Sequence, residues 1–310
     1  MNISEKTRAK ILKNFRGITV KLLTFILLCG LSYVILYPFL FKILAAFMSK
    51  SDLSNNLVTL IPMKWTFDNF RYVLKETEFF TALKNTFLYA ILDASLATAS
   101  AALVGYGIAK FKFRGVNVLT AILVVVMLMP LQTLSIPIYL NFYSWNPFGI
   151  FSVLGLNGVN VLGTPLPTVI MAATSFGFRA GIFVILMRQY YIGVPNEILE
   201  AAFVDGAGPY RTFASIVLPN ACSMLVVIFS LSFAWQWTDT FYSDLLYGDK
   251  LMLPTLSAFL QNVEQSDKEY YLQFVRANTF TILAILPLII LYCILQKQII
   301  QGIERSGLVG

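Results

Sequence analysis

Long apolar stretches dominate this chain and restrict what it can fold into. Six stretches reach the roughly 20 residues that a helix needs to cross a bilayer: 22–48, 81–109, 116–142, 166–187, 216–237 and 277–296. Only 13% of the residues are charged, against about 25% in an average soluble domain. Helices satisfy their own backbone hydrogen bonds inside lipid. The sequence therefore predicts an all-α, polytopic membrane protein with six transmembrane helices.

The distribution of basic residues predicts the orientation of the chain. The leader before the first apolar stretch carries six Lys or Arg residues, and the short segment 110–114 adds three. The segment 145–165 carries no charge, and 239–276 holds six acidic residues against three basic ones. Because cytoplasmic loops are enriched in Lys and Arg, we expect both termini and the loops at 110–115 and 188–215 to be cytoplasmic.

The apolar pattern also suggests how the chain is divided. Residues 1–21 form a basic N-terminal segment, and the first apolar stretch is too long for a cleaved signal peptide. Residues 22–300 form the six-helix domain, with a cytoplasmic loop at about 190–215. Residues 301–310 form a cytoplasmic tail. We expect the chain to cross a membrane several times.

Several kinds of chemistry lack the residues they need. The chain has no histidine and only three cysteines, Cys29, Cys222 and Cys293, whose spacing fits no zinc or redox motif. It also has no phosphate-binding GxxxxGK[ST] motif, so we expect any ATP hydrolysis to lie on another chain. Few acids lie within the apolar stretches, which leaves little material for a membrane enzyme. We expect no cofactor or metal on this chain, and no nucleic-acid partner.

The segment EAAFVDGAGPYRTFASIVLPN, residues 200–220, interrupts the apolar pattern on the cytoplasmic side. One helix is expected to begin near Pro195, a residue suited to a first helical turn. Gly206 is expected to end that helix, and Pro209 to open a second one. This pattern predicts a helix–turn–helix elbow on the membrane surface. An amphipathic linker resting on the headgroups is the plainer interpretation.

The same segment resembles the EAA loop of binding-protein-dependent ABC transporter permeases. Its Asp-Gly-Ala sequence is similar to the carbohydrate-uptake group, of the maltose-transporter type. The matching residues are Glu200, Ala201, Ala202, Asp205, Gly206, Ala207, Phe213, Ile216, Leu218 and Pro219. Residues 60–74 resemble the first outer loop of that family, and 129–140 its third span. Residues 296–310 resemble the C-terminus of the second, shorter permease of the pair.

The resemblance implies a non-catalytic permease subunit of an ATP-driven importer of a sugar or oligosaccharide. Its expected partners are a second permease subunit, two cytoplasmic ABC ATPase subunits that bind ATP and Mg²⁺, an external solute-binding protein, the sugar and the lipid bilayer. The EAA loop is expected to dock in an ATPase subunit as a coupling helix. The tail is expected to lie between the ATPase subunits through Gly302, Glu304, Arg305, Gly307 and Leu308. A frayed chain end is the alternative for the tail.

Two charged residues, Asp93 and Arg179, lie within predicted spans. A charge at the bilayer centre costs about 2.5–3.5 kcal/mol on insertion scales, so both side chains should face the bundle interior. They either line the path, form a buried ion pair or contact the partner permease. Trp235 and Trp237 end the fifth stretch, where indole rings typically anchor a helix at the membrane interface; a sugar-stacking platform is the alternative. The long uncharged outer segment 143–167 is expected to cap the outer mouth or contact the binding protein.

Other transporter classes remain as alternatives. An ABC importer for a peptide or amino acid would carry a similar loop, and the Asp-Gly-Ala sequence favours sugar only through the resemblance. A secondary transporter would need ionisable groups in its spans and paired repeats with broken helices. Only Asp93 and Arg179 stand out in this respect.

Overall fold

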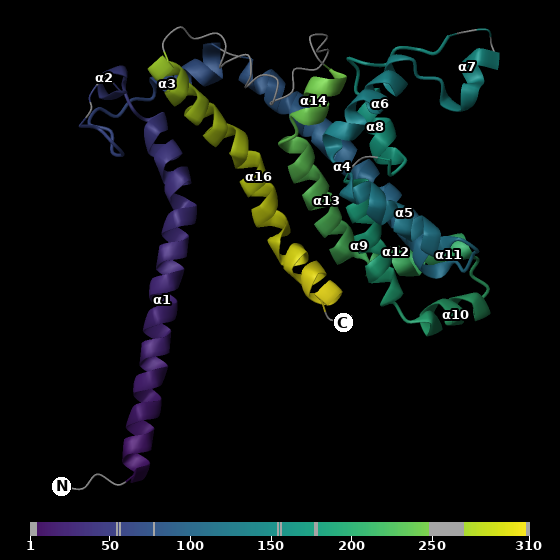
Figure 1. The fold of residues 1–310 in the computed structure, drawn as a ribbon, viewed down its shortest axis with the longest axis horizontal. Helices are drawn as coiled ribbons and strands as arrows, with labels where there is room; N and C mark the ends of the chain where they lie inside the picture. The colour runs from purple at the N-terminus through teal and green to yellow at the C-terminus, as the bar shows by residue number, and fades with distance from the viewer. Residues whose placement is uncertain are drawn as a thin grey trace. The chain divides into compact units, whose positions relative to one another are not determined.

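The structure is a computed structural model that describes residues 5–53, 55, 57–76, 78–153, 155, 157–176, 179–247 and 270–307. Most of these residues are helical (Figure 1). The chain divides into two compact units. The first contains Met1–Thr77 and Ser266–Leu283, and the second contains Glu78–Gln265 and Ala284–Gly310. The long helix α16 (Tyr270–Gly307) contributes residues to both units.

The first unit joins one long helix to short helical segments. Its elements are α1 (Glu5–Ala46), α2 (Lys50–Leu53), α3 (Asp68–Arg71), the π-helix η1 (Tyr72–Glu76) and the beginning of α16. Buried Asn69 donates hydrogen bonds of 2.9 Å to the carbonyl oxygens of Ala46 and Met48. Lys42 donates a 3.0 Å bond to the side-chain oxygen of Asn278. These contacts tie α3 and α16 to the end of α1, where the last carbonyls have no partner within the helix.

The apolar part of α1 is uncovered within its own unit. The segment Gly17–Ala46 has a mean hydropathy of 2.1, and none of its most apolar window is buried. Such a surface is stable in lipid or against another apolar helix, and unfavourable in water. The helix is therefore suited in length and composition to cross a membrane.

In the second unit α4 (Phe79–Lys110) is the central element. It packs against α8 (Leu166–Ala173), α9 (Ala180–Ile192) and α13 (Cys222–Trp237) (Figure 1). The remaining elements are α5 (Val116–Leu128), α6 (Leu131–Tyr143), η2 (Pro147–Gly149), α7 (Ile150–Val153), α10 (Asn196–Val204), α11 (Pro209–Thr212), η3 (Phe213–Val217), α12 (Leu218–Asn220), α14 (Phe241–Leu246) and the end of α16.

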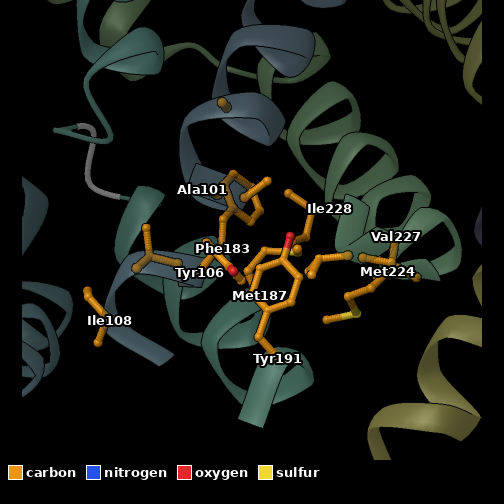
Figure 2. Close-up of a cluster of buried hydrophobic side chains, with 14 of the residues drawn as sticks. Ala101, Tyr106, Ile108, Phe183, Met187, Tyr191, Met224, Val227 and Ile228 are labelled. Atoms are coloured by element: carbon orange, nitrogen blue, oxygen red, sulfur yellow. The ribbon is translucent and has the colours of Figure 1, made fainter. Parts of the chain in front are cut away.

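Small residues on α4 allow this central position. Its buried alanines are Ala82, Ala90, Ala94, Ala97, Ala101 and Ala102. At Gly105 a Cβ atom would lie 2.6 Å from the Cβ of Met187 on α9. Small side chains let helix backbones approach closely, which drives helix association in membranes. Larger side chains from α9 and α13, including Met187 and Ile228, then fill the cluster beside Ala101 (Figure 2).

The six continuous spans expected from the sequence are only partly found. Within the described residues, three helices are long and apolar enough to cross a membrane: Gly17–Ala46, Phe79–Lys110 and Leu272–Gly302. Two further candidates are bent pairs, Val116–Leu128 with Gln132–Tyr143 and Pro209–Asn220 with Cys222–Trp237, the latter bent by 75°.

The third expected span breaks at Met129 and Pro130. Pro130 has no N–H group for a helical hydrogen bond, and it disfavours helical geometry at the residue before it. Met129 accordingly has an extended backbone with ψ of 133°. The apolar stretch 116–142 therefore forms two helices, α5 and α6, and not one continuous helix.

The fourth expected span, 166–187, is interrupted between α8 and α9. Ser175 lies in this interruption with a positive φ of 53°, which is uncommon outside glycine. Ser100 of α4 donates a 2.6 Å hydrogen bond to the carbonyl oxygen of Ala172, and Ser175 donates a 2.9 Å bond to Ser100. The carbonyl oxygen of Ala172 also accepts a 3.4 Å bond from the amide of Ser175, so the two serine side chains add to the turn that ends α8.

The described residues of the segment 143–167 make several contacts with the rest of their unit. Trp145 and Val159 exchange backbone hydrogen bonds of 3.0 and 2.9 Å. The amide of Gly163 donates a 2.8 Å bond to the carbonyl oxygen of Leu246, which ends α14. Phe142 joins Leu246 in a small buried cluster. The described part of this segment therefore packs on α14, a contact that the sequence analysis did not anticipate.

Candidate functional site

A small cavity that contains two charged side chains in a largely apolar lining lies where α4, the α8–α9 break and α13 meet. Its charged lining residues are Asp93 of α4 and Arg179, which directly precedes α9. The other lining residues are Ala97, Thr168, Met171, Ala172, Ala180, Phe183, Ser232, Trp235, Gln236 and Tyr242. The cavity has a volume of about 60 Å³. One water needs about 10–15 Å³ on this measure, so the cavity holds a few waters and is too small for a sugar ring.

Arg179 has two partners in this region. Its Nη2 atom lies 4.0 Å from Oδ1 of Asp239, and its guanidinium carbon lies 5.1 Å from the ring centre of Trp235. Trp235 in turn stacks on Phe183 at 5.4 Å between ring centres. A guanidinium gains from the negative face of an indole ring and from a carboxylate in a setting of low dielectric constant. Arg179 therefore holds the break before α9 against the end of α13.

Asp239 is the most buried charged group of this site, with only 2% of its side chain exposed. Its Oδ2 atom accepts hydrogen bonds from the amides of Tyr242 (3.0 Å) and Ser243 (3.2 Å), at the start of α14. An acidic side chain there satisfies amides that have no helical partner. Burial raises the pKa of Asp239, and the neighbouring Arg179 guanidinium opposes that shift.

The structure brings Asp93 and Arg179 to the same cavity, as one of the sequence interpretations required. The ion pair of Arg179 at 4.0 Å is with Asp239, a residue that the sequence analysis had counted only as an acid of the outer loop. Its sequence position offered a signal, because Asp239 lies two residues before the first residue of α14, close enough to accept bonds from the first amides of that helix. A pair between Asp93 and Arg179 stays a prediction.

The interface-anchor interpretation of the two tryptophans was wrong for Trp237. This residue is 3% exposed, and its indole N–H donates a 3.0 Å hydrogen bond to the carbonyl oxygen of Ala284 on α16. Trp235 lines the cavity beside Arg179. Both rings pack inside the second unit. A tryptophan at the end of an apolar stretch could do this or anchor the helix at the membrane surface, and the sequence does not distinguish the two.

The predicted elbow is present as α10, a turn at Gly206, and α11. Gly206 has a φ of +78°. The amide of Ala207 bonds to the carbonyl oxygen of Ala202 at 2.9 Å, and the amide of Gly206 to that of Phe203 at 3.0 Å. This pair of bonds is the Schellman motif that ends a helix at a left-handed residue. The glycine of the Asp-Gly-Ala sequence is therefore required by the local backbone.

Three contacts fix the elbow to the C-terminal end of α4. Lys110 donates hydrogen bonds to the carbonyl oxygen of Val194 (2.7 Å) and to the side-chain oxygen of Asn196 (2.9 Å). Tyr106 packs against Phe213 at 4.8 Å between ring centres. Leu199 joins the hydrophobic core at 7% exposure. The elbow is held at both of its ends and by its inner face.

The outer face of the elbow is exposed and partly apolar. Glu200, Ala201, Asp205 and Gly206 are exposed, whereas Ala202 is buried and Ala207 half-buried. Four large apolar or aromatic side chains are also exposed here: Ile198, Phe203, Val204 and Tyr210. Val204 and Tyr210 reach 87% and 91% exposure. Ile216, Leu218 and Pro219 lie beyond the elbow, in η3 and α12.

The tail differs from a separate terminal segment, because α16 continues through Gly307. Glu304 and Arg305 belong to this last part of the helix, and Leu308 lies outside the described residues. Extending an existing helix avoids the cost of nucleating a new one. The glycines in 301–310 had suggested a separate segment without helical structure. At Gly302 a Cβ atom would lie 2.6 Å from Cγ2 of Val227 and 2.8 Å from the carbonyl oxygen of Ser223. Glycine at 302 thus lets α16 pack closely on α13.

The described residues contain no group of three or more His, Cys, Asp or Glu side chains placed to hold a metal ion. The candidate functional features in the described residues are therefore the charge cluster beside the α8–α9 break and the exposed elbow.

Comparison with known proteins gives consistent results. The chain is 28% identical over 290 residues to the maltodextrin transport system permease protein MalD of Streptococcus pneumoniae, covering 92% of this chain and 94% of that protein. Its fold matches a bacterial ABC transporter involved in the import of the acidic polysaccharide alginate, with a TM-score of 0.70, 21% identity, and coverage of 96% of this chain and 99% of the other. A second structure shows the bacterial alginate ABC transporter in complex with an alginate pentasaccharide-bound periplasmic protein. It matches with a TM-score of 0.65 and 16% identity over 91% of this chain and 95% of that one.

A family profile covers most of the second unit. The profile described as binding-protein-dependent transport system inner membrane component matches residues 97–305. This range includes the break before α9, the whole elbow and most of α16. Because the match extends over more than half of the 310 residues, the chain belongs to the family of binding-protein-dependent transport system inner membrane components.

Proposed function

We propose that this chain is the non-catalytic transmembrane permease subunit of an ATP-driven importer that carries a sugar or oligosaccharide across a bacterial cytoplasmic membrane. The family membership supports the permease role. The substrate class is supported by the relatives, since MalD serves maltodextrin transport and the structural neighbours serve alginate import. Maltodextrin and alginate are both carbohydrate polymers.

The observation that carries this proposal is the elbow formed by α10 and α11. Its inner face is fixed to α4, and its outer face presents Glu200, Phe203 and Val204 to the surroundings. A rigid, exposed helix with mixed apolar and acidic character is suited to seat in a partner protein. In our proposal the partner is a cytoplasmic ATPase subunit, which supplies the ATP and Mg²⁺ chemistry.

The elbow transmits motion because its contacts lead directly into the membrane bundle. A displacement of α10 is carried by Lys110 and Tyr106 to α4, which packs on α8, α9 and α13. Packed helices move as units or shift between discrete arrangements. ATP-driven closure of two ATPase subunits would thereby change the arrangement of these helices.

The charge cluster of Asp93, Arg179 and Asp239 has a positioning role in this proposal. Its cavity of about 60 Å³ is too small for a sugar ring, so the path runs along a surface shared with a second permease subunit. The Arg179–Asp239 contact holds the α8–α9 break beside α13. A break in a span is a natural place for helices to change their relative orientation.

The remaining partners follow from the family and from exposed surfaces. A second permease subunit and the lipid bilayer would cover the apolar surface of α1, whose most apolar window is 0% buried. An external solute-binding protein would deliver the sugar, as supported by the alginate transporter captured with its periplasmic protein. The excess of basic residues in the leader and in 110–114 supports a cytoplasmic location for both segments.

The tail has a related role in our proposal. The last turns of α16 carry Glu304, Arg305 and Gly307, and the chain continues to Leu308. We infer that this end meets the two ATPase subunits, on the cytoplasmic side where the elbow also lies. Gly302 contributes indirectly, since its packing on α13 sets the direction of the helix.

The experiment that tests the proposed function is uptake by the chain reconstituted with its co-purifying subunits in liposomes. We expect uptake of labelled maltodextrins that stops when ATP is removed while ion gradients are kept. Glu200→Arg should reduce uptake and the stimulation of ATPase activity by the binding protein, with a normal amount of protein in the membrane. Glu200→Gln, which keeps a hydrogen-bond acceptor, should be milder.

Two outcomes would contradict parts of this proposal. Uptake that continues without ATP and collapses with the ion gradient would identify a secondary transporter. ATP-dependent uptake of a labelled peptide or amino acid, with no uptake of saccharides, would retain the permease role and reject the sugar.

A further inference from the structure

A hollow opens at the cytoplasmic end of α4, and it shares no lining residue with the cavity beside Asp93 and Arg179. Its volume is about 470 Å³, within the range of small-ligand pockets. The loop residues Phe111, Lys112, Phe113 and Arg114 line it, and Arg188 enters from α9. Three cationic side chains from two elements of the fold therefore converge on one concave surface, without an acidic residue in the lining.

Arg188 is placed here by the close contact of α4 with α9. A Cβ atom at Gly105 would lie 3.0 Å from the backbone nitrogen of Arg188, so the backbones touch at this level. The Nε atom of Arg188 is buried and has no hydrogen-bond partner in the described part of the chain. An unsatisfied donor on a charged group is unfavourable, which favours an acceptor beside this guanidinium.

None of the three cations, Lys112, Arg114 and Arg188, forms an ion pair with a residue that the structure describes. A guanidinium fork together with two further cations matches the oxygens of a phosphate group, which accept several hydrogen bonds at once. The phosphate diester of a phospholipid supplies such oxygens with a negative charge that persists near neutral pH, and it joins them to a lipid tail.

The surroundings of the hollow favour a lipid as the source of that phosphate. Phe111 and Phe113 are 51% and 47% exposed and alternate with the basic residues of the loop. Exposed apolar rings next to Lys and Arg are typical of segments that lie at the boundary between headgroups and acyl chains. Basic pockets between membrane helices on the cytoplasmic side are suited to acidic headgroups.

We propose that Arg188, Lys112 and Arg114 bind the phosphate of an anionic phospholipid at the cytoplasmic surface of the membrane. The site rests on the orientation proposed above, and it requires neither the sugar nor the ATPase. Arg188 engages the phosphate through its fork, and the two loop cations hold it from the opposite side. The headgroup bridges the loop 111–114 to α9.

The test is lipid retention by the full-length chain, purified with its co-purifying subunits. The complex is reconstituted in vesicles of phosphatidylcholine and phosphatidylglycerol in a ratio of 3:1, extracted with mild detergent, and examined by native mass spectrometry. We expect a tightly retained phosphatidylglycerol molecule for each copy of this chain. Arg188→Gln should reduce its retention about tenfold, as expected for the loss of a charged hydrogen bond.

A double variant protects the test from a folding defect. Lys112 and Arg114 are both exposed loop residues, so Lys112→Gln with Arg114→Gln should reduce retention with no change in thermal stability. Lys297→Gln is the matched control, because Lys297 is an exposed cation of α16 outside the hollow. Retention should be unchanged in this variant.

Three results would overturn the proposal. Equal retention of phosphatidylglycerol by the unmodified chain and the double variant would remove the site. Equal retention of phosphatidylcholine and phosphatidylglycerol by the unmodified chain would remove its charge selectivity. Displacement of the lipid by millimolar inorganic phosphate would identify a site for free phosphate. Failure of sugar uptake leaves this measurement unaffected, which separates it from the proposed function.

Discussion

The ammonium group of Lys110 donates a 2.7 Å hydrogen bond to the carbonyl oxygen of Val194, and so connects the end of α4 to the entry of the elbow. A second bond of 2.9 Å reaches the side chain of Asn196. Lysine serves two acceptors here because its ammonium group carries three donors and no acceptor. The connection spans residues that are 84 and 86 positions apart in the sequence.

Lys110→Met should loosen this connection with little change of side-chain length. The expected loss is about 1 kcal/mol of local stability, since both bonds involve a charged donor but one of them is exposed. Hydrogen–deuterium exchange of 194–204 should become faster, and sugar uptake should fall with the ATPase subunit still bound. Lys84→Met, at an exposed position of α4, should change neither quantity. Unchanged exchange in Lys110→Met would show that the elbow does not depend on this contact.

Two neighbouring glycines of the elbow allow a matched comparison. Gly206 has a φ of +78°, whereas Gly208 has a φ of −73°. Nothing lies within 4 Å of a Cβ atom at either position, so sterics with neighbours do not distinguish them. Gly206→Ala should destabilise the end of α10 by about 1 kcal/mol, because an alanine in the left-handed region is strained.

Gly208→Ala should be neutral or slightly stabilising, because it reduces the freedom of the unfolded chain without strain. Two measurements check this: hydrogen–deuterium exchange of the amides next to Gly206, and thermal unfolding of the purified complex. An equal effect of the two substitutions would argue against the Schellman turn as the reason for this glycine.

The contact of Arg179 with Asp239 can be measured by a double-mutant cycle. Arg179→Met and Asp239→Asn should each lower thermal stability, and the two together should cost less than their sum. Asparagine keeps an oxygen for the amides of Tyr242 and Ser243, so the cycle reports mainly on charge. We expect a coupling energy near 1 kcal/mol, because Arg179 is 32% exposed and solvent weakens such a pair.

The same cycle with Asp93→Asn tests the alternative carboxylate. A smaller coupling with Arg179 is expected, since Asp239 is the carboxylate at 4.0 Å. A larger coupling for Asp93 than for Asp239 would reverse the assignment and identify Asp93 as the main partner.

Gly302 is expected to tolerate no side chain. Gly302→Ala would bring a methyl group within 2.6 Å of Val227 and 2.8 Å of a backbone oxygen of α13. The helices must separate, at a cost of about 1–3 kcal/mol. Gly107→Ala on α4 is the matched control, because nothing lies within 4 Å of its Cβ position. Thermal unfolding that is equal in the two variants would contradict the close packing of α16 on α13.

A deletion distinguishes this packing role from the proposed ATPase contact of the tail. Removing 306–310 leaves Gly302 and its contacts in place. We expect unchanged thermal stability and an unchanged amount of protein in the membrane, with weaker stimulation of the ATPase. Full stimulation after the deletion would return the last residues to the status of a frayed end.

The sequence was informative where one local signal dominates. The elbow followed from Pro195, Gly206 and Pro209, because proline and glycine restrict the backbone whatever surrounds them. The structure begins α10 at Asn196 and ends it at Val204, close to the predicted limits. The mostly helical character of the described residues followed in the same way from apolar length.

The sequence was less informative where distant residues decide the outcome. The break before α9 is stabilised by Ser100, which is 72 residues away from its acceptor at Ala172. The burial of Trp237 depends on Ala284 of α16, and the role of Asp239 depends on Arg179. The apolar pattern of one stretch contains no information about contacts with distant residues. Continuous spans and a membrane-surface role for Trp237 were therefore predicted.

The alanine-rich face of α4 has a consequence for how this protein can change over time. Three helices rest on that face, and at Gly105 the neighbouring backbone leaves no room for even a methyl group. A larger side chain there must displace several neighbouring residues together. A second substitution at one of those neighbours would therefore seldom restore the packing. The opposite face, where Leu88, Leu92 and Leu103 are exposed, accepts exchanges among apolar residues freely. The positions of α4 that tolerate substitution should therefore recur with the period of the helix. Substitutions should be frequent on its exposed side and rare on its buried side.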